Sequence, residues 1–352
     1  ALRVDNLRQL PLQGHVKLLS PHGWQINPSE IDFKALKHGC PLTVDVQIKA
    51  QEERRGAFGG HVQLKSKRFD VSAPFTLIRL GDDAAPVHVE QDVEDETLVF
   101  AIDNGYSRWQ LAPTYHGGVV SWRTGELPVN HLLTAFPQPG GATLGWLKPW
   151  FGGIRPILPP LNEYNEGWPG KLHQEQFTAQ VCERPDEQGV VWRCLCLSAQ
   201  LKGEHFKGLR AQIAYLTVGK SNVLKIIYRL ANLTDVYQQA KPGVIAYCQL
   251  DGRYDNSVLC GEGVQRKRTP RMAWVQTGQW GAVTNPATGR TLVGVTSTRQ
   301  TTVELSDWGQ DGGHLLAYQM ARIPPHAQET LVLYLVLTDS LEEAKRYAAL
   351  AE

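Results

Sequence analysis

The sequence has almost no excess of either charge and no long apolar run. Its 352 residues include 36 Lys and Arg against 35 Asp and Glu, which gives a formal net charge of +1. Nucleic-acid-binding proteins carry a basic excess, and a membrane-spanning helix needs about 20 apolar residues. The longest apolar run, 331–337, has only the length of a strand. We therefore expect no nucleic-acid partner and no membrane partner. No basic-then-apolar leader follows Ala1, which favours a cytoplasmic location.

Cysteine is also scarce. The six cysteines are too few for a disulfide-stabilised scaffold of this size, and none of them forms a Cys-x-x-Cys pair. Neither a zinc ribbon nor a thioredoxin-like motif is therefore supported. Cys194 and Cys196 share one face of an expected strand, because side chains alternate with period two. We favour two small core residues over a metal or redox role for this pair, and we expect no cofactor.

Strand signals dominate the sequence. Short alternating or β-branched runs recur about every ten positions between Gly, Pro, Asn and Asp, as in 42–48, 61–64, 223–230 and 291–296. No nucleotide-binding glycine pattern follows a strand, and no strand–helix alternation indicates a parallel sheet. The tail after Ser340 has a capping signal and an apolar stripe. The sequence therefore predicts an all-β protein with a short C-terminal helix.

Two domains are expected, with a boundary in the loop-like and acidic segment 81–95. We place the first domain at 1–90 and the second at 91–352. The first resembles the NEW-type, fibronectin-like β-sandwich that accompanies carbohydrate-active proteins. The resemblance rests on a Trp before a strand, a Pro turn, a Gly turn and an alternating strand, in Pro21-His-Gly-Trp24, Asn27-Pro28, Leu36-Lys-His-Gly39 and 42–48.

The second domain contains four motifs in a recognisable order. They are Asp103-Asn-Gly105 with Tyr115-His-Gly-Gly-Val-Val-Ser-Trp122, Trp150-Phe-Gly-Gly-Ile-Arg-Pro-Ile-Leu-Pro159, Lys171-Leu-His173-Gln-Glu-Gln-Phe177, and Arg229-Leu-Ala-Asn-Leu-Thr-Asp235 followed by Pro242-Gly-Val-Ile-Ala-Tyr-Cys-Gln-Leu250. Together they resemble the galactose-mutarotase (aldose 1-epimerase) superfamily. The resemblance implies a β-supersandwich, in which large antiparallel sheets pack face to face and one concave side holds a carbohydrate.

Activity in that superfamily needs an acid and a base on opposite sides of the sugar. The resemblance places the acid, a histidine, at Ile245, and the base, a glutamate, near Gln319. Isoleucine has no proton to transfer, and glutamine does not accept one at neutral pH. We therefore expect the domain to lack epimerase activity.

The residues that the resemblance assigns to sugar binding match the family pattern better than the acid and base positions do. Arg155 can donate a fork of hydrogen bonds to vicinal hydroxyls or to a carboxylate, and His173 matches a family histidine that binds a hydroxyl. Tryptophan rings can pack against the apolar C–H faces of a sugar. The expected sugar-binding residues are Arg155, His173, Asn162, Trp150, Trp168, Gln319 and Trp308, with no metal ligand among them.

The expected function is that of a non-catalytic, carbohydrate-binding accessory region. Its expected partners are a carbohydrate and a catalytic domain in the same or a longer chain. Two alternatives stay open. Loop carboxylates Glu163, Glu166 or Glu175 could serve an atypical epimerase, a glycoside hydrolase or a lyase. Alternatively, the second domain could be architectural and pack against a partner.

Overall fold

The structure is a computed structural model. It describes residues 1–82, 84–125, 129–140, 149–159, 170–186, 189–254, 257–267, 273–298, 300–307 and 313–351. The chain forms two compact units, Ala1–Arg79 and Leu80–Glu352. The division precedes the boundary expected at residue 90, because strand β9 (His88–Glu94) pairs along its whole length with β10 (Thr97–Asp103) of the larger unit. No helix among the described residues is long and apolar enough to cross a membrane.

The smaller unit is built on a four-stranded antiparallel sheet. Its strand order is β4 (Glu30–Leu36), β2 (Leu12–Leu19), β7 (Gly56–Ser66) and β8 (Asp70–Arg79). Two short pairs accompany it, β1 (Leu2–Val4) with β5 (Leu42–Val44) and β3 (Trp24–Asn27) with β6 (Gln47–Ala50). Alternating apolar residues bury one face, with Val16, Leu18, Ile26, Ile31 and Phe33 at the centre. The fibronectin-like identity of this unit stays a prediction.

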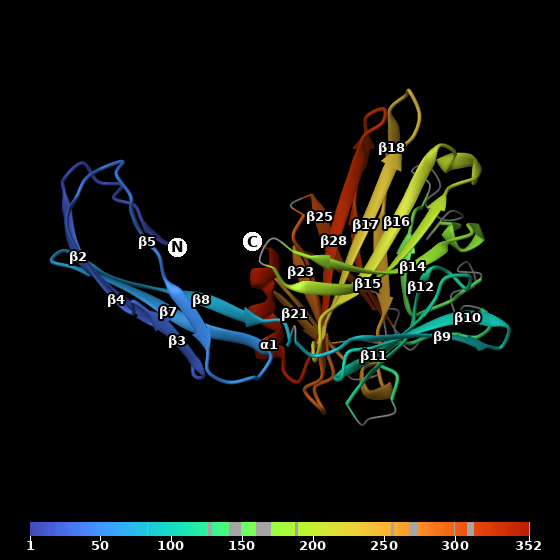
Figure 1. Ribbon diagram of the computed structural model, residues 1–352, viewed down its shortest axis with the longest axis horizontal. Helices are drawn as coiled ribbons and strands as arrows, with labels where there is room; N and C mark the ends of the chain where they lie inside the picture. Colours follow the sequence, from blue (N-terminus) through green and yellow to red (C-terminus); the bar gives the residue numbers. More distant parts are fainter. Residues whose placement is uncertain are drawn as a thin grey trace. The chain divides into compact units, whose positions relative to one another are not determined.

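The larger unit contains two nine-stranded antiparallel sheets (Figure 1). The first large sheet has the order β22 (Ala273–Gly278), β25 (Thr301–Asp307), β26 (Gly313–Gln319), β19 (Gly243–Tyr247), β13 (Ile154–Ile157), β12 (Gly118–Thr124), β11 (Ser107–Ala112), β10, β9. The second has the order β14 (Thr178–Pro185), β15 (Val191–Gln200), β16 (Leu209–Thr217), β17 (Val223–Asn232), β28 (Gln328–Thr338), β24 (Thr291–Thr296), β23 (Trp280–Thr284), β20 (Val258–Gly261), β21 (Val264–Lys267). The predicted all-β fold is confirmed.

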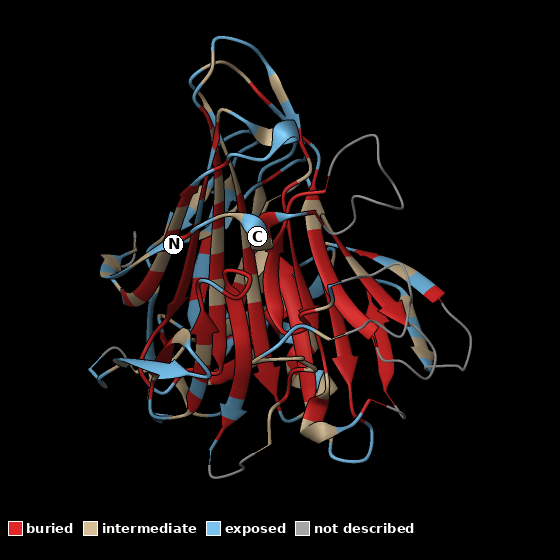
Figure 2. Ribbon diagram, turned by 90° about the vertical axis from the view of Figure 1, so that its right-hand side faces the viewer, coloured by how far each residue is buried: buried red, intermediate tan, exposed pale blue. Residues whose placement is uncertain are grey.

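The two large sheets pack face to face over one apolar core. Alternate residues of the strands supply it, including Trp109, Ile154, Ala246 and Leu315 from the first sheet and Leu195, Tyr215, Ile226 and Leu333 from the second. The central strands are accordingly buried along most of their length (Figure 2). Because side chains alternate, the residues between these core positions project from the outer faces of the two sheets.

Smaller elements complete the larger unit. A two-stranded ribbon joins β18 (Gln238–Ala240) to β27 (Ala321–Ile323). The predicted C-terminal helix is α1 (Leu341–Arg346), and Ser340 caps it by accepting a hydrogen bond from the Glu343 N–H. Short 3₁₀ turns lie at Leu172–Gln174, Glu204–Phe206, Leu250–Gly252 and Tyr347–Ala351.

The Asn-Gly turn of the first motif has a structural role. The buried Asn104 amide donates hydrogen bonds to Thr217 Oγ1, Val218 O and Ser221 O, at 2.9, 3.0 and 2.9 Å. Its oxygen accepts from the backbone N–H groups of Tyr106 and Ser107. The carboxamide therefore fastens the β10–β11 turn of the first large sheet to the β16–β17 turn of the second.

Candidate functional site

The candidate site lies on the outer face of the first large sheet. Arg155 on β13 is paired with Ile245 on β19, which is paired in turn with Leu316 on β26. Their neighbours Ile154, Ala246 and Leu315 all belong to the core between the sheets. Since side chains alternate along a strand, Arg155, Ile245 and Leu316 point away from that core and share the outer face.

Phe151 is at the centre of a cluster of polar and aromatic side chains on this face. The Tyr115, His173 and His116 ring centroids lie 4.9, 5.1 and 5.6 Å from that of Phe151. The guanidinium carbon of Arg155 lies 5.3 Å from the same centroid. We call Tyr115, His116, Phe151, Arg155 and His173 the Phe151 cluster. It joins the loop before β12, the loop before β13, β13 itself and the 3₁₀ turn at Leu172–Gln174.

Glycines make this close packing possible. Gly152 and Gly153 both have φ of +69°, and a Cβ on either would lie 2.3 Å from a backbone oxygen, that of Leu133 or that of Val119. A Cβ on Gly118 would lie 2.1 Å from the Ile154 oxygen and 2.5 Å from the His116 ring. The Gly-Gly pairs of the sequence motifs thus let two loops approach the strands closely enough to bring Phe151 against His116.

Several buried polar atoms of the Phe151 cluster have no hydrogen-bond partner among the described residues. They are the Tyr115 hydroxyl, both ring nitrogens of His116, Nε of Arg155 and Nδ1 of His173. Each buried polar group left without a partner costs about 1–3 kcal/mol. A folded chain rarely gathers so many such groups at one place. The concentration of unpaired donors and acceptors around one aromatic ring makes the Phe151 cluster the candidate site.

Burial and nearby cations set the electrostatics of the Phe151 cluster. Burial lowers the pKa of His173 to about 4, helped by Arg155 and Lys171, and burial followed by Arg155 lowers the pKa of His116 far below its usual range. Burial raises the pKa of Tyr115 to about 12 against the opposing effect of Arg155. Both imidazoles are therefore neutral at pH 7. Among the described residues, no carboxylate contributes to these shifts.

The segment before β13 is held in place by a buried histidine outside the Phe151 cluster. His131 Nε2 lies 3.1 Å from Thr124 Oγ1, and its Nδ1 accepts the Asp251 backbone N–H at 3.2 Å. Two residues on, the Leu133 oxygen accepts the Gly153 N–H at 2.7 Å. Burial lowers the pKa of His131 to about 4, with Asp251 opposing this shift and Arg290 adding to it.

We expect acid to destabilise the protein partly through His131. The unfolded chain binds a proton there near pH 6.5 and the folded chain only near pH 4, so the free energy of unfolding falls as pH drops through this window. His131→Gln removes this titration. Urea denaturation at pH 7 and pH 5 should show a loss about 2 kcal/mol smaller in the variant than in the wild type. An equal loss in both proteins would contradict the assignment.

Comparisons with known proteins give a match only at the level of structure. No protein-family model and no curated protein sequence matches the chain. Among solved structures, a candidate aldose 1-epimerase from Klebsiella pneumoniae aligns with a TM-score of 0.57 at 12% identity, over 75% of this chain and 86% of that one. A galactose mutarotase-like protein from Clostridium acetobutylicum aligns with a TM-score of 0.53 at 12% identity, over 72% and 99%.

The larger unit has the galactose mutarotase-like fold. A TPR-domain containing protein from Parabacteroides distasonis also aligns, with a TM-score of 0.53 at 11% identity, over 80% of this chain and 50% of that one. Identities this low show the fold alone. The chemistry of this mutarotase-like unit must therefore be argued from its own residues.

The mutarotase-like unit brings together some of the residues expected at the sugar site. Arg155 and His173 both belong to the Phe151 cluster. Trp150 lies on the same face of the sheet, where it packs against Ile157, Ile245 and Leu316 and meets the Tyr247 ring edge-on, with centroids 5.7 Å apart. Asn162, Trp168 and Trp308 lie outside the described residues.

Gln319 is separated from these residues by the sheet itself. It follows Leu315 and Ala317 at intervals of two along β26, and both of those residues belong to the core between the sheets. Its Oε1 accepts a hydrogen bond from Thr301 Oγ1 at 3.1 Å. Gln319 therefore projects from the core side of the sheet, whereas Arg155 projects from the outer side.

The position that the sequence resemblance assigns to the acid carries no proton donor. Ile245 is fully buried and packs with Ile157, Tyr247 and Leu316. A carboxylate does lie farther along the same row, because Leu316 is paired with Glu304 on β25. Three strand spacings separate its backbone from that of Arg155, about 14 Å. Burial raises the pKa of Glu304, and the neighbouring Lys241 opposes this shift.

The loop carboxylates divide into two groups. Glu163 and Glu166 lie outside the described residues. Glu175 accepts hydrogen bonds from the backbone N–H groups of Lys202 and Gly203, at 3.0 and 2.9 Å. This carboxylate thus fastens the segment before β14 to the turn after β15.

Sequence reasoning missed part of the Phe151 cluster. Tyr115 and His116 lie in a motif whose glycines supported the family resemblance. Phe151 directly follows Trp150, which was itself expected at the sugar site. The signal in the sequence was a histidine beside a Gly-Gly pair. Glycine leaves room for a neighbouring ring that a larger side chain would exclude. His314, which is buried near Tyr247 with ring centroids 5.7 Å apart, had no such signal.

Proposed function

We propose that the mutarotase-like unit binds a carbohydrate at the Phe151 cluster and does not epimerise it. The observation that carries the proposal is the group of buried, unpaired polar atoms on Tyr115, His116, Arg155 and His173. Neutral imidazoles and a phenol can both donate to and accept from hydroxyls, and a guanidinium can donate to two neighbouring oxygens. A hydroxyl-rich ring offers partners for all of these groups at once.

The charge of the Phe151 cluster limits the chemical class of its ligand further. Arg155 is almost fully buried, and no carboxylate in the described part of the chain contributes to the shift of its pKa. Burial of a cation is costly unless an anion or several hydrogen-bond acceptors compensate. The cluster therefore favours a sugar that presents several hydroxyl oxygens or an anionic substituent to Arg155.

We expect no turnover because the acid and the base that proton transfer would need are not placed together at the Phe151 cluster. Ile245 occupies the acid position, and Glu304 lies about three strand spacings from Arg155, next to Lys241. In an active site of this type the acid and the base flank one sugar ring. Binding without chemistry is the role of an accessory region, and a catalytic domain in the same or a longer chain remains its proposed partner.

The test is a panel of neutral hexoses, uronic acids and hexose phosphates, screened by saturation-transfer NMR. We expect at least one class to bind, and Arg155→Met to weaken it about 10–100-fold, because a hydrogen bond to a charged group contributes about 1.5–3 kcal/mol. Arg184→Met is the matched control, because Arg184 lies on the second large sheet. The proposal fails if no sugar binds, or if both variants bind equally well.

A turnover measurement on the same samples separates binding from catalysis. Exchange NMR of glucose and galactose anomers should show no acceleration by the wild-type protein. Acceleration would favour the alternative of an atypical enzyme. Glu163→Gln and Glu166→Gln variants would then test whether loop carboxylates supply the chemistry.

A further inference from the structure

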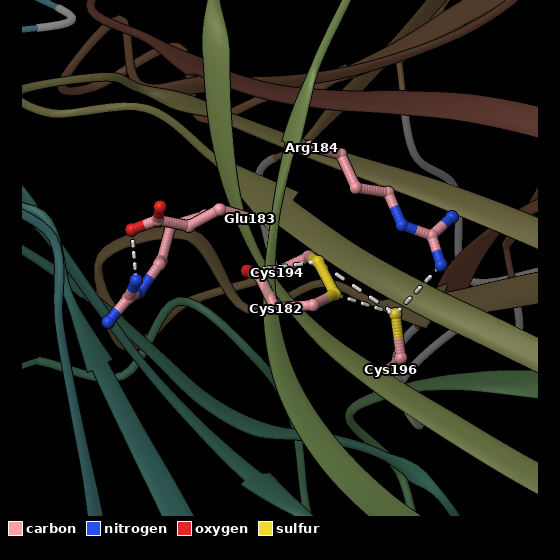
Figure 3. Close-up of a disulfide and its surroundings, with 6 residues drawn as sticks. Cys182, Glu183, Arg184, Cys194 and Cys196 are labelled. Atoms are coloured by element: carbon pink, nitrogen blue, oxygen red, sulfur yellow. Dashed lines mark hydrogen bonds and ion pairs between the residues drawn. A yellow bond between two sulfur atoms is a disulfide. The ribbon is translucent and has the colours of Figure 1, made fainter.

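Three cysteines meet on the outer face of the second large sheet, far in the fold from the Phe151 cluster. Cys182 on β14 is directly opposite Cys194 on β15, and the two form a disulfide. Cys196 lies two residues along β15 on the same face. The three Sγ atoms lie within 4.8 Å of one another (Figure 3). We call these residues the cysteine triangle.

The position of Cys196 argues against simple exchange with the disulfide. Its Sγ is 3.1 Å from Cys182 Sγ and 3.8 Å from Cys194 Sγ. A thiol poised for exchange lies on the extension of the S–S bond, so that its distances to the two sulfurs differ by about 2 Å, the length of that bond. The observed difference is much smaller, so Cys196 lies beside the bond. Three sulfurs in a triangle can become the ligands of one metal ion once the disulfide is opened.

The surroundings of the cysteine triangle are open and cationic. Cys182 and Cys196 line a cavity of about 290 Å³ together with Arg184, Arg229 and Gln180. Arg184 Nη2 donates to Cys196 Sγ at 3.6 Å. An ion can therefore enter from the cavity, and two guanidinium groups offset the negative charge that three thiolates would bring.

We propose that the cysteine triangle, once reduced, binds one soft metal ion through three thiolates. Reduction by a dithiol breaks the Cys182–Cys194 bond, adds two electrons and two protons to form two thiols, and leaves the dithiol as a disulfide. Binding then releases the three thiol protons to solvent. Thiolates select Cu(I) and Zn(II). Three thiolates satisfy trigonal Cu(I), whereas Zn(II) would take a water from the cavity as its fourth ligand.

The distances fit such an ion after a small movement. Zn–S bonds of about 2.3 Å place tetrahedral sulfur ligands about 3.8 Å apart. Cys196 is already 3.8 Å from Cys194. Opening the disulfide requires only that Cys182 and Cys194 turn apart on strands that keep their pairing. The described residues offer no histidine or carboxylate as a further ligand.

The test uses the full chain, reduced with a phosphine and desalted without oxygen. Titration against a chromophoric chelator is run in two arms, one with Zn(II) and one with Cu(I). We expect one ion per chain in at least one arm. Cys196→Ser and Cys182→Ser should each weaken binding by more than about 100-fold. The loss of a residue that only hydrogen-bonds to a metal ligand costs less, about 10–100-fold. Cys40→Ser, at an exposed site in the smaller unit, is the matched control and should bind as the wild type does.

The outcomes separate the metal site from its alternatives. Oxidised wild-type protein should bind no ion, because two of the three ligands are tied in the disulfide. Circular dichroism confirms that each serine variant is folded before titration. The proposal is overturned if the reduced wild type binds neither ion more tightly than the Cys196→Ser and Cys182→Ser variants do. This result would not bear on sugar binding, since the Phe151 cluster lies on the other large sheet.

Discussion

Gly153→Ala is expected to lower the free energy of unfolding of the larger unit by more than about 3 kcal/mol, a size reached only by severe core defects. The added Cβ would lie 2.3 Å from the Val119 oxygen, on the strand that β13 pairs with. Relief would require β12 and β13 to separate, and Arg155 and Phe151 would move with them. Urea denaturation followed by tryptophan fluorescence measures the loss.

Gly125→Ala is the matched control for this change. Gly125 also has a positive φ, +55°, but nothing lies within 4 Å of an added Cβ. It should therefore cost only the backbone penalty of the left-handed conformation, about 1–2 kcal/mol. If the two alanine variants lose the same stability, the close approach of strand and loop at Gly153 is not what holds the site together.

Arg155→Met is expected to make the protein more stable while it loses its ligand. A buried guanidinium without a compensating anion opposes folding, and a flexible apolar side chain of similar length can fill its place beside Phe151. We expect the free energy of unfolding to rise by about 1–3 kcal/mol, with the loss of sugar affinity given above. Urea denaturation and sugar titration are made on the same preparation.

Arg290→Met, in contrast, should lower the free energy of unfolding. Arg290 is also mostly buried, but it is paired with Asp251, at 3.6 Å, and with Asp339. Its removal leaves Asp251 with less compensation, so this variant should lose stability. If Arg155→Met is destabilised as much as Arg290→Met, Arg155 has a structural role, and its unpaired Nε does not indicate a ligand.

The sequence predicted the class of fold well because strands of this size leave a clear pattern. Runs such as Val223–Asn232 alternate or are apolar throughout, as expected for strands buried in a two-sheet core. The domain boundary was harder to place. Strand β9 is acidic and largely exposed, as edge strands often are, so its composition resembled a linker.

Individual site residues were predictable only where a motif fixed their register. Arg155 stands two residues after Gly153 of a Gly-Gly pair, and the pair sets its position. Gln319 was placed by counting back from a turn, and in a strand a shift of one residue moves a side chain to the opposite face. Cys182 is twelve residues from Cys194 in sequence, and only the pairing of β14 with β15 makes the two adjacent.

The most direct measurement of the central claim is a crystal structure of the protein with a sugar identified by the NMR panel. We expect the sugar ring to pack on Phe151, with its oxygens within hydrogen-bonding distance of Arg155, His116 and His173. No carboxylate and imidazole should face each other across its anomeric carbon. A sugar bound elsewhere, or one flanked by such an acid–base pair, would contradict the account.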